Sequence, residues 1–245
     1  MKTLMVFLSL VLSATCALAQ PPSSSPSLKP LKIIPPEFPR EFPEALARAY
    51  PNGGQVRLLV TVGADGQLKE SLLTSYSARP FAEEANAALK EWKFEPARWM
   101  NQPITARVEV KVTFEHHGTM VSTTAPEMLI SATESRLEIR NAAYRAYGLA
   151  ELDRVPVLLR SVKPIYPAPL ADRGMAGGVT VDFYVDEQGM VRMPSVEREA
   201  PLELAEAAVT AIRQWQFEPP LVRGKPVLAH LQQQFNFSRA PGGGI

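Results

Sequence analysis

Residues 85–96 of the chain read ANAALKEWKFEP, and residues 208–219 read AVTAIRQWQFEP. Both stretches place small and apolar residues at helical spacing ahead of a shared Trp-x-Phe-Glu-Pro ending. The closing proline ends a helix, because it has no amide hydrogen and its ring clashes with the preceding turn. Each stretch therefore predicts one amphipathic helix that stops before the Phe-Glu-Pro triplet.

The same register extends over a longer part of the chain. Shifted by 123 positions, residues 54–114 align without a gap on residues 177–237, and about 15 of the pairs are identical. Self-similarity at one fixed period is the signature of a repeated structural unit. The chain therefore holds two tandem copies of one module.

Each copy repeats one order of elements: a strand of alternating apolar residues, a tight turn at a glycine, a second strand, the helix and a last strand. In the first copy these are 56–62, Gly66, 68–73, 81–92 and 104–114; in the second they are 179–185, Gly189, 191–196, 204–215 and 227–237. The predicted fold class is α+β, with two tandem small modules that are each a three-stranded antiparallel sheet with one main helix (strand-strand-helix-strand).

The N-terminus has the pattern of an export signal. Lys2 precedes a short apolar run, and Ala17-Leu18-Ala19 makes a cleavage site ahead of Gln20. We expect a cleaved signal peptide and a periplasmic protein. Two alternatives stay open, lipidation at Cys16, the single cysteine, and an uncleaved anchor in the inner membrane.

The remaining boundaries follow from the repeat and from the proline content. The expected segments are the signal peptide at 1–19, a Pro/Ser-rich tether at 20–36, module 1 at 37–115, a linker at 116–152, module 2 at 153–238 and a flexible tail at 239–245. Within the linker, Ser131 and Glu134 favour a capped helix running to Tyr147, with an ordered loop as the alternative. Asp153–Pro156 leads into an extended segment that we expect to add a strand or clamp to module 2.

The last strand of each module is expected at the edge of its sheet, in the order second–first–last. In the first copy, Arg107, Glu109 and Lys111 on the solvent face would protect that edge. The second copy has neutral residues at and around the same positions, namely His230, Gln232, Gln233 and Gln234. This edge either docks an extended peptide or is merely solvated or packed against the other repeat.

Module 2 joins Pro164-x-Tyr166-Pro167, a Gly-Val-x-Val-x-Phe strand, Trp-x-Phe-x-Pro, Gly224-x-Pro226 and a closing phenylalanine. This combination resembles the TonB C-terminal domain family, and module 1 follows it more loosely, with Phe42 in place of the tyrosine. The resemblance implies a non-enzymatic periplasmic domain that binds an extended segment of outer-membrane receptors by strand addition. By the same resemblance, the partner-binding residues are Lys163, Pro164, Ile165, Tyr166, Pro167, Leu228, His230, Gln232 and Gln234.

Other classes of function find little support in the sequence. The 26 basic and 25 acidic residues give a net charge of +1, which provides no field for nucleic acid. The adjacent His116 and His117 would point to opposite sides of a strand, so we expect no metal site, no cofactor and no small-molecule substrate. No nucleophile motif is present, and Glu95 and Glu218 are expected at the surface after each helix, so we expect no enzyme.

The partners expected from this reading are envelope proteins, including outer-membrane receptors. Two alternatives stay open, one concerning the edge strands and one concerning the N-terminus. An envelope scaffold would use them for self-association, for example in a homodimer, and an anchored energy transducer would retain its N-terminal anchor.

Overall fold

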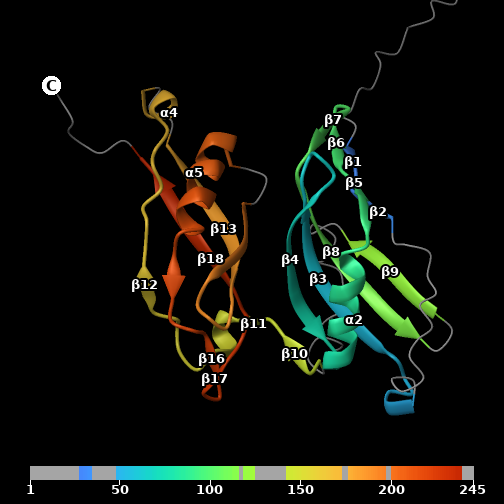
Figure 1. The fold of residues 1–245 in the computed structure, drawn as a ribbon. Helices are drawn as coiled ribbons and strands as arrows, with labels where there is room; N and C mark the ends of the chain where they lie inside the picture. Colours follow the sequence, from blue (N-terminus) through green and yellow to red (C-terminus); the bar gives the residue numbers. More distant parts are fainter. Residues whose placement is uncertain are drawn as a thin grey trace, which may run out of the picture.

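The computed structural model of the protein describes residues 28–34, 48–115, 118–124, 142–172, 176–196 and 200–238. Two sheet-and-helix modules lie side by side in it (Figure 1). The predicted signal peptide, His116, His117 and the residues 239–245 lie outside the described residues.

Module 1 is built around a twisted antiparallel sheet covered by one helix. Its main strands are β3 (Gly54–Val62), β4 (Leu68–Tyr76) and β8 (Ala106–Glu115), and helix α2 (Arg79–Leu89) connects β4 to β8. The sheet order β10-β4-β3-β8-β9 contains the predicted second–first–last arrangement. Two further strands flank it, β9 (Gly118–Thr124) outside β8 and β10 (Tyr144–Arg145) outside β4.

Module 2 repeats this arrangement in fewer strands. Its sheet has the order β11-β18-β13-β14, and the strands are β11 (Tyr147–Gly148), β13 (Gly177–Val185), β14 (Val191–Val196) and β18 (Ala229–Phe237). Helix α5 (Leu202–Ile212) connects β14 to β18. The α+β fold class and the three-stranded core of both modules are therefore confirmed.

Short elements complete the description. They are β1 (Leu28–Lys29), β2 (Lys32–Ile34), β5 (Lys93–Glu95), β6 (Ala97–Trp99) and β7 (Gln102–Ile104) in module 1, and η2 (Leu149–Glu151), β12 (Leu158–Arg160), α4 (Ala168–Asp172), β15 (Gln216–Phe217), β16 (Leu221–Val222) and β17 (Lys225–Pro226) in module 2. Strand β12 pairs with β15, so the extra strand expected after Pro156 is present.

The turn glycines behave as the sequence predicts. Gly66 (φ 75°) and Gly189 (φ 82°) both adopt the left-handed conformation that other residues rarely take. They close the β3–β4 and β13–β14 hairpins, where Gly66 and Gly189 donate their amide hydrogens to the carbonyls of Gly63 and Asp186.

Each helix buries one face against its own sheet. The helix residues Phe81, Ala85, Ala88 and Leu89 join β3 and β8 side chains in one core, and Leu204, Ala208 and Ile212 do the same in module 2. Trp92 and Trp215 are both buried in these cores, as their place on the apolar stripe predicts. Because the helices cover one face only, the opposite face of each sheet needs another cover.

The helix-free faces of the two sheets cover each other. Leu59 and Leu72 of module 1 and Met193 and Leu228 of module 2 form a separate buried cluster. Polar contacts surround it: the Arg107 guanidinium donates to the Met193 carbonyl (2.8 Å), and Arg192 contacts Glu70 (3.2 Å). The two modules are therefore packed on each other rather than merely tethered.

This packing corrects the prediction that Arg107 and Glu109 lie on a solvent face. Arg107 is half-buried at the module interface, and Glu109 is buried beside the equally buried Arg57, with 3.6 Å between their charged atoms. Burial raises the pKa of Glu109, and the nearby Arg57 opposes this shift. The prediction was wrong because a charged residue type does not show whether its side chain faces solvent or is covered by another module.

The linker also differs from the prediction of a helix running to Tyr147. Tyr144–Arg145 pairs with β4, and Tyr147–Gly148 pairs with β18, so the described end of that helix is extended. Residues 28–34 differ as well. We placed them in the tether, but they pair with β5 and β6, and Leu31 is buried in the module 1 core.

Candidate docking edge on module 2

Strand β18 is paired along its full length on one side and along only two residues on the other. Its nine residues pair antiparallel with β13, from Ala229 opposite Val185 to Phe237 opposite Gly177. On the outer side β11 runs parallel to β18 and pairs Tyr147 with Ala229 and Gly148 with His230. Among the described residues, no strand lies on this outer side of β18 from Leu231 to Phe237.

The backbone of this open stretch points its hydrogen-bonding groups outward at alternate residues. The Tyr147 amide donates to the Leu228 carbonyl (2.9 Å), so position 228 faces the outer side. Since a strand residue directs its N–H and C=O to the same side, the even-numbered residues that follow face outward too. Gln232, Gln234 and Asn236 therefore offer unpaired ladder positions to an added strand.

The side chains of the same residues lie on the helix-free face. Gln232 and Gln234 are exposed, and the Gln232 amide donates to Asp182 Oδ1 (2.7 Å) across the sheet. His230 is stacked on the Tyr184 ring, with 4.8 Å between centroids, and its Nε2 lies 3.4 Å from Asp182 Oδ1. Burial lowers the pKa of His230, so the ring itself is uncharged at neutral pH, while the Asp182 carboxylate lies beside it.

The second predicted contact segment lies beside the far end of β18. The Tyr166 ring packs against Phe237, with 5.8 Å between their centroids. Just ahead of the segment, the Trp215 indole donates to the Val162 carbonyl (2.8 Å) and fixes its start to the module 2 core. Lys163 is exposed and Ile165 is 84% exposed, while Pro164, Tyr166 and Pro167 are half-buried.

Leu228 is the predicted contact residue that the structure places elsewhere. Its side chain is fully buried in the cluster between the modules, and its carbonyl is already bonded to Tyr147. It is therefore not accessible to a partner, and we do not carry it into the proposal. Leu228 lies on the opposite face of the strand from the apolar residues that pack against the helix. The local sequence pattern therefore did not predict that the other module would bury it.

The equivalent edge in module 1 is already filled. Strand β9 pairs with β8 over seven residues, from Glu109 opposite Thr124 to Glu115 opposite Gly118. The chain itself therefore supplies the added strand in module 1. The run Gly118-Thr-Met-Val-Ser-Thr-Thr has the β-branched content of a strand, and this signal would have predicted β9.

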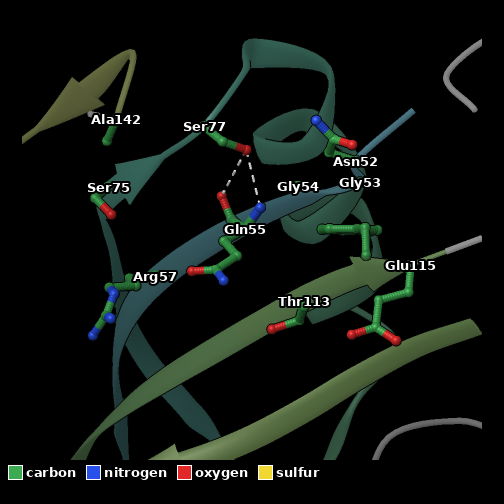
Figure 2. Close-up of a pocket in the computed structure, with 11 residues that line it drawn as sticks. Asn52, Gly53, Gly54, Gln55, Arg57, Ser75, Ser77, Thr113, Glu115 and Ala142 are labelled. Carbon is green, nitrogen blue, oxygen red and sulfur yellow. Dashed lines mark hydrogen bonds between the residues drawn. The ribbon is translucent and has the colours of Figure 1, made fainter. Parts of the chain in front are cut away.

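A polar hollow of about 370 Å³ lies on module 1, at the end of β3 and β8 (Figure 2). Its lining includes Gln55, Arg57, Ser77 and Thr113, together with Ala142 at the start of the described part of the linker. The Ser77 hydroxyl lies between the amide nitrogen (2.9 Å) and the carbonyl oxygen (3.4 Å) of Gln55. None of the predicted partner-binding residues line it.

Two features of the described residues bear on other functions. They contain no group of three or more His, Cys, Asp or Glu side chains arranged to hold a metal ion. They also contain no helix that is both long and apolar enough to cross a membrane. Glu95 and Glu218 are each paired with a cation, Lys32 (3.4 Å) and Arg154 (2.6 Å) respectively.

The geometry defines a class of protein, a tandem of strand-strand-helix-strand modules packed through their helix-free faces. The chain belongs to the Gram-negative bacterial TonB protein C-terminal family, whose model matches residues 38–116 and 162–238. These two matches cover more than half of the chain and fall on the two modules.

Individual relatives match one module's length of sequence. Protein TonB of Pseudomonas aeruginosa is 35% identical over 88 residues, 36% of this chain and 24% of that protein, and Protein TonB of Vibrio cholerae is 28% identical over 87 residues, 35% of this chain and 36% of that protein. The chain thus spans between a quarter and about a third of the length of these relatives. The solution NMR structure of the Pseudomonas aeruginosa TonB CTD is 28% identical, covers 39% of this chain and 96% of that chain, and has a TM-score of 0.31.

Proposed function

We propose that the protein is a non-enzymatic module of the periplasm that binds an extended segment of an envelope protein, such as an outer-membrane transporter, by strand addition to β18. The observation that carries this proposal is the open edge from Leu231 to Phe237, where β13 occupies one side only. An unpaired edge with outward N–H and C=O groups is a template for one more strand.

The surroundings of the edge fit a peptide partner. Gln232 and Gln234 carry no charge, so they do not repel a neighbouring strand as lysine would. Lys163, Pro164, Ile165, Tyr166 and Pro167 lie near the Phe237 end and give the partner side chains a second surface to contact. In this proposal His230 marks the point where β11 ends and the partner strand begins.

Proline substitutions test the edge at single-residue resolution. Gln232→Pro removes an amide hydrogen that faces outward, and proline is tolerated in an edge strand when its nitrogen faces solvent. We expect Gln232→Pro and Gln234→Pro to abolish partner capture while module 2 remains folded. Gln232→Ala, which keeps the amide, should retain capture, and Gln233→Pro should unfold module 2 because position 233 faces β13.

Capture is measured by photocrosslinking in intact cells from position 236, an exposed, outward-facing residue that the proline variants leave unchanged. Recovery of an outer-membrane transporter that is lost in Gln232→Pro supports the proposal. Only self-crosslinks would instead assign the edge to an envelope scaffold, and capture that survives Gln232→Pro would show that β18 is not the docking strand. N-terminal sequencing separately tests export, because a mature start at Gln20 excludes an anchored energy transducer.

A further inference from the structure

A run of exposed apolar residues lies on module 2 outside the docking edge. Val155 (68% exposed), Val157 (48%), Leu158 (39%) and Leu159 (59%) form what we call the apolar strip. Figure 1 places β12, which contains Leu158 and Leu159, on the side of module 2 turned away from module 1. Three consecutive exposed apolar residues are uncommon on a protein surface and mark a contact with another protein, a ligand or a membrane.

The backbone of the strip is poorly suited to strand addition. Strand β12 has only three residues, and its pairing with β15 shifts register between Leu158 and Arg160. Pro156 has no amide hydrogen, and the Val157 carbonyl is already bonded to the Glu218 amide (2.7 Å). Short, irregular edges of this kind discourage a further strand, so the strip offers side chains rather than a ladder.

The charges around the strip are predominantly positive. Arg160 and Lys163 are exposed, and among the described residues neither has an acidic partner within salt-bridge distance. The nearby acids are already engaged: Asp153 accepts the amides of Arg223 and Gly224 (2.8 Å each), and Glu218 pairs with Arg154 (2.6 Å). The β16–β17 turn adds the exposed cations Arg223 and Lys225.

A second copy of the chain does not match this charge pattern. In a two-fold dimer the same patch of each copy faces the other, so the exposed cations around one strip would approach those around the second strip, and juxtaposed like charges are unfavourable. An anionic lipid surface satisfies both features at once, because protruding apolar side chains enter the acyl boundary while lysine and arginine contact the headgroups.

We propose that the apolar strip and its flanking cations rest on the surface of a bilayer that contains anionic phospholipids. This contact orients module 2 on a membrane while β18 stays free at a different part of the sheet. It does not depend on strand addition, because it uses neither the even-numbered residues of β18 nor Tyr166, and Lys163 is the one residue that it shares with the proposed docking surface.

A local fluorescence probe tests the contact. In the full chain with Cys16→Ser, Leu159→Cys is labelled with an environment-sensitive fluorophore and mixed with vesicles of phosphatidylcholine and phosphatidylglycerol. We expect a blue shift and an intensity increase that are absent with phosphatidylcholine alone. The matched control, Met100→Cys, is 67% exposed on module 1 and should show no change. The local readout separates the strip from any insertion of the N-terminus.

Charge reversal then tests the role of the cations. Arg160→Glu together with Lys225→Glu, two exposed cations outside the docking surface, should weaken vesicle binding at the Leu159 probe by more than about fivefold, since one basic residue contributes about that factor near an anionic surface. No response to anionic vesicles, or an equal response at positions 159 and 100, overturns the proposal. A concentration-dependent dimer that Leu158→Ser dissociates would instead assign the strip to a second copy. Crosslinking from Asn236 remains unaffected in each case, so failure here is distinct from failure of the docking proposal.

Discussion

The last strands of the two modules occupy equivalent positions but have opposite edges. Strand β8 is enclosed, with β3 on one side and β9 on the other, whereas β18 has β13 on one side and only the two-residue β11 on the other. Equivalent side chains on these two strands also differ in solvent exposure. Glu109 is buried next to Arg57, whereas its equivalent Gln232 is exposed. Duplication has thus produced one module that completes its own sheet and one that leaves an edge available.

The interface between the modules explains why both copies are present. Glu70 and Met193 are equivalent positions of the repeat, and they meet, with the Met193 amide 3.3 Å from Glu70 Oε1. Contact between equivalent positions is the feature of an interface between like subunits. Module 1 therefore covers the helix-free face of module 2. This packing supports β18 while one edge of that strand stays unpaired.

The turn glycines give the largest expected difference between the modules. A Cβ at Gly189 would lie 2.0 Å from the Phe217 carbonyl oxygen, whereas a Cβ at Gly66 would lie 3.0 Å from the Phe94 carbonyl oxygen. Both substitutions place alanine at positive φ, but only Gly189→Ala also forces the backbone of β15 to move. We expect Gly189→Ala to cost about 4 kcal/mol of unfolding free energy and Gly66→Ala about 1–2 kcal/mol.

Urea unfolding followed by circular dichroism measures both substitutions, because tryptophan emission would combine Trp92 and Trp99 of module 1 with Trp215 of module 2. Equal costs for the two glycines would mean that the β15 backbone accommodates the new methyl group. The control is Gly224→Ala, which has positive φ but no atom within 4 Å of its Cβ, and should resemble Gly66→Ala.

Leu228 gives the next largest effect, because it fills the space between the modules. Leu228→Ala should cost about 3 kcal/mol, the usual range for a buried leucine that leaves a cavity. Its equivalent in module 1, Thr105, is exposed, so Thr105→Ala should change stability by only a few tenths of a kcal/mol. Thermal unfolding followed by circular dichroism compares the two variants. A small effect of Leu228→Ala would show that the modules do not depend on this cluster.

The contact between the modules also marks the limit of what the sequence could predict. The alternation of apolar residues and the paired glycines were sufficient for the three-strand core, the helices and the strand order. The strands β10 and β11 are two residues long and form only because β4 and β18 lie beside them, so Tyr144 and Tyr147 carry no strand pattern of their own. The predictions that Glu109 faces solvent and that Leu228 contacts a partner were wrong for the same reason. Whether a residue on the helix-free face is exposed to solvent depends on packing against the other module.

The tryptophans provide a smaller difference between equivalent residues. Trp215 Nε1 donates to the Val162 carbonyl (2.8 Å), whereas Trp92 Nε1 is buried and has no partner among the described residues. Replacement by phenylalanine removes similar volume at both sites, but only Trp215→Phe leaves a partly buried carbonyl without its donor. We expect Trp215→Phe to be more destabilising than Trp92→Phe by about 1–2 kcal/mol.

Thermal unfolding of each single variant measures this difference. Equal losses would show that Trp92 has a hydrogen-bond partner outside the described residues. Val162 can be replaced without losing its carbonyl, so Val162→Ala is the control for the packing contribution of that segment.

His230 gives the smallest effect, and its sign follows from burial. Its folded pKa is lower than its ordinary value of 6.5, with burial as the main cause, Arg107 acting in the same direction and Asp182 opposing it. The unfolded chain then binds the proton more readily, so stability is fully present above pH 6.5 and falls as the pH drops below it. Arg107, the equivalent residue in module 1, stays charged throughout this range, so module 1 has no counterpart of this histidine contribution.

Urea midpoints at pH 7.5 and at pH 5.5 provide the measurement, followed by circular dichroism in the wild type and in His230→Gln. These pH values bracket the ordinary histidine pKa of about 6.5. Part of the wild-type loss between them should disappear in His230→Gln, because glutamine cannot take up a proton. An unchanged pH dependence would assign the loss to carboxylates elsewhere, and Asp182→Asn then tests the one that faces the ring. Because the ring lies where β11 ends, its protonation would place a positive charge at the start of the free edge, while β8 would be unaffected.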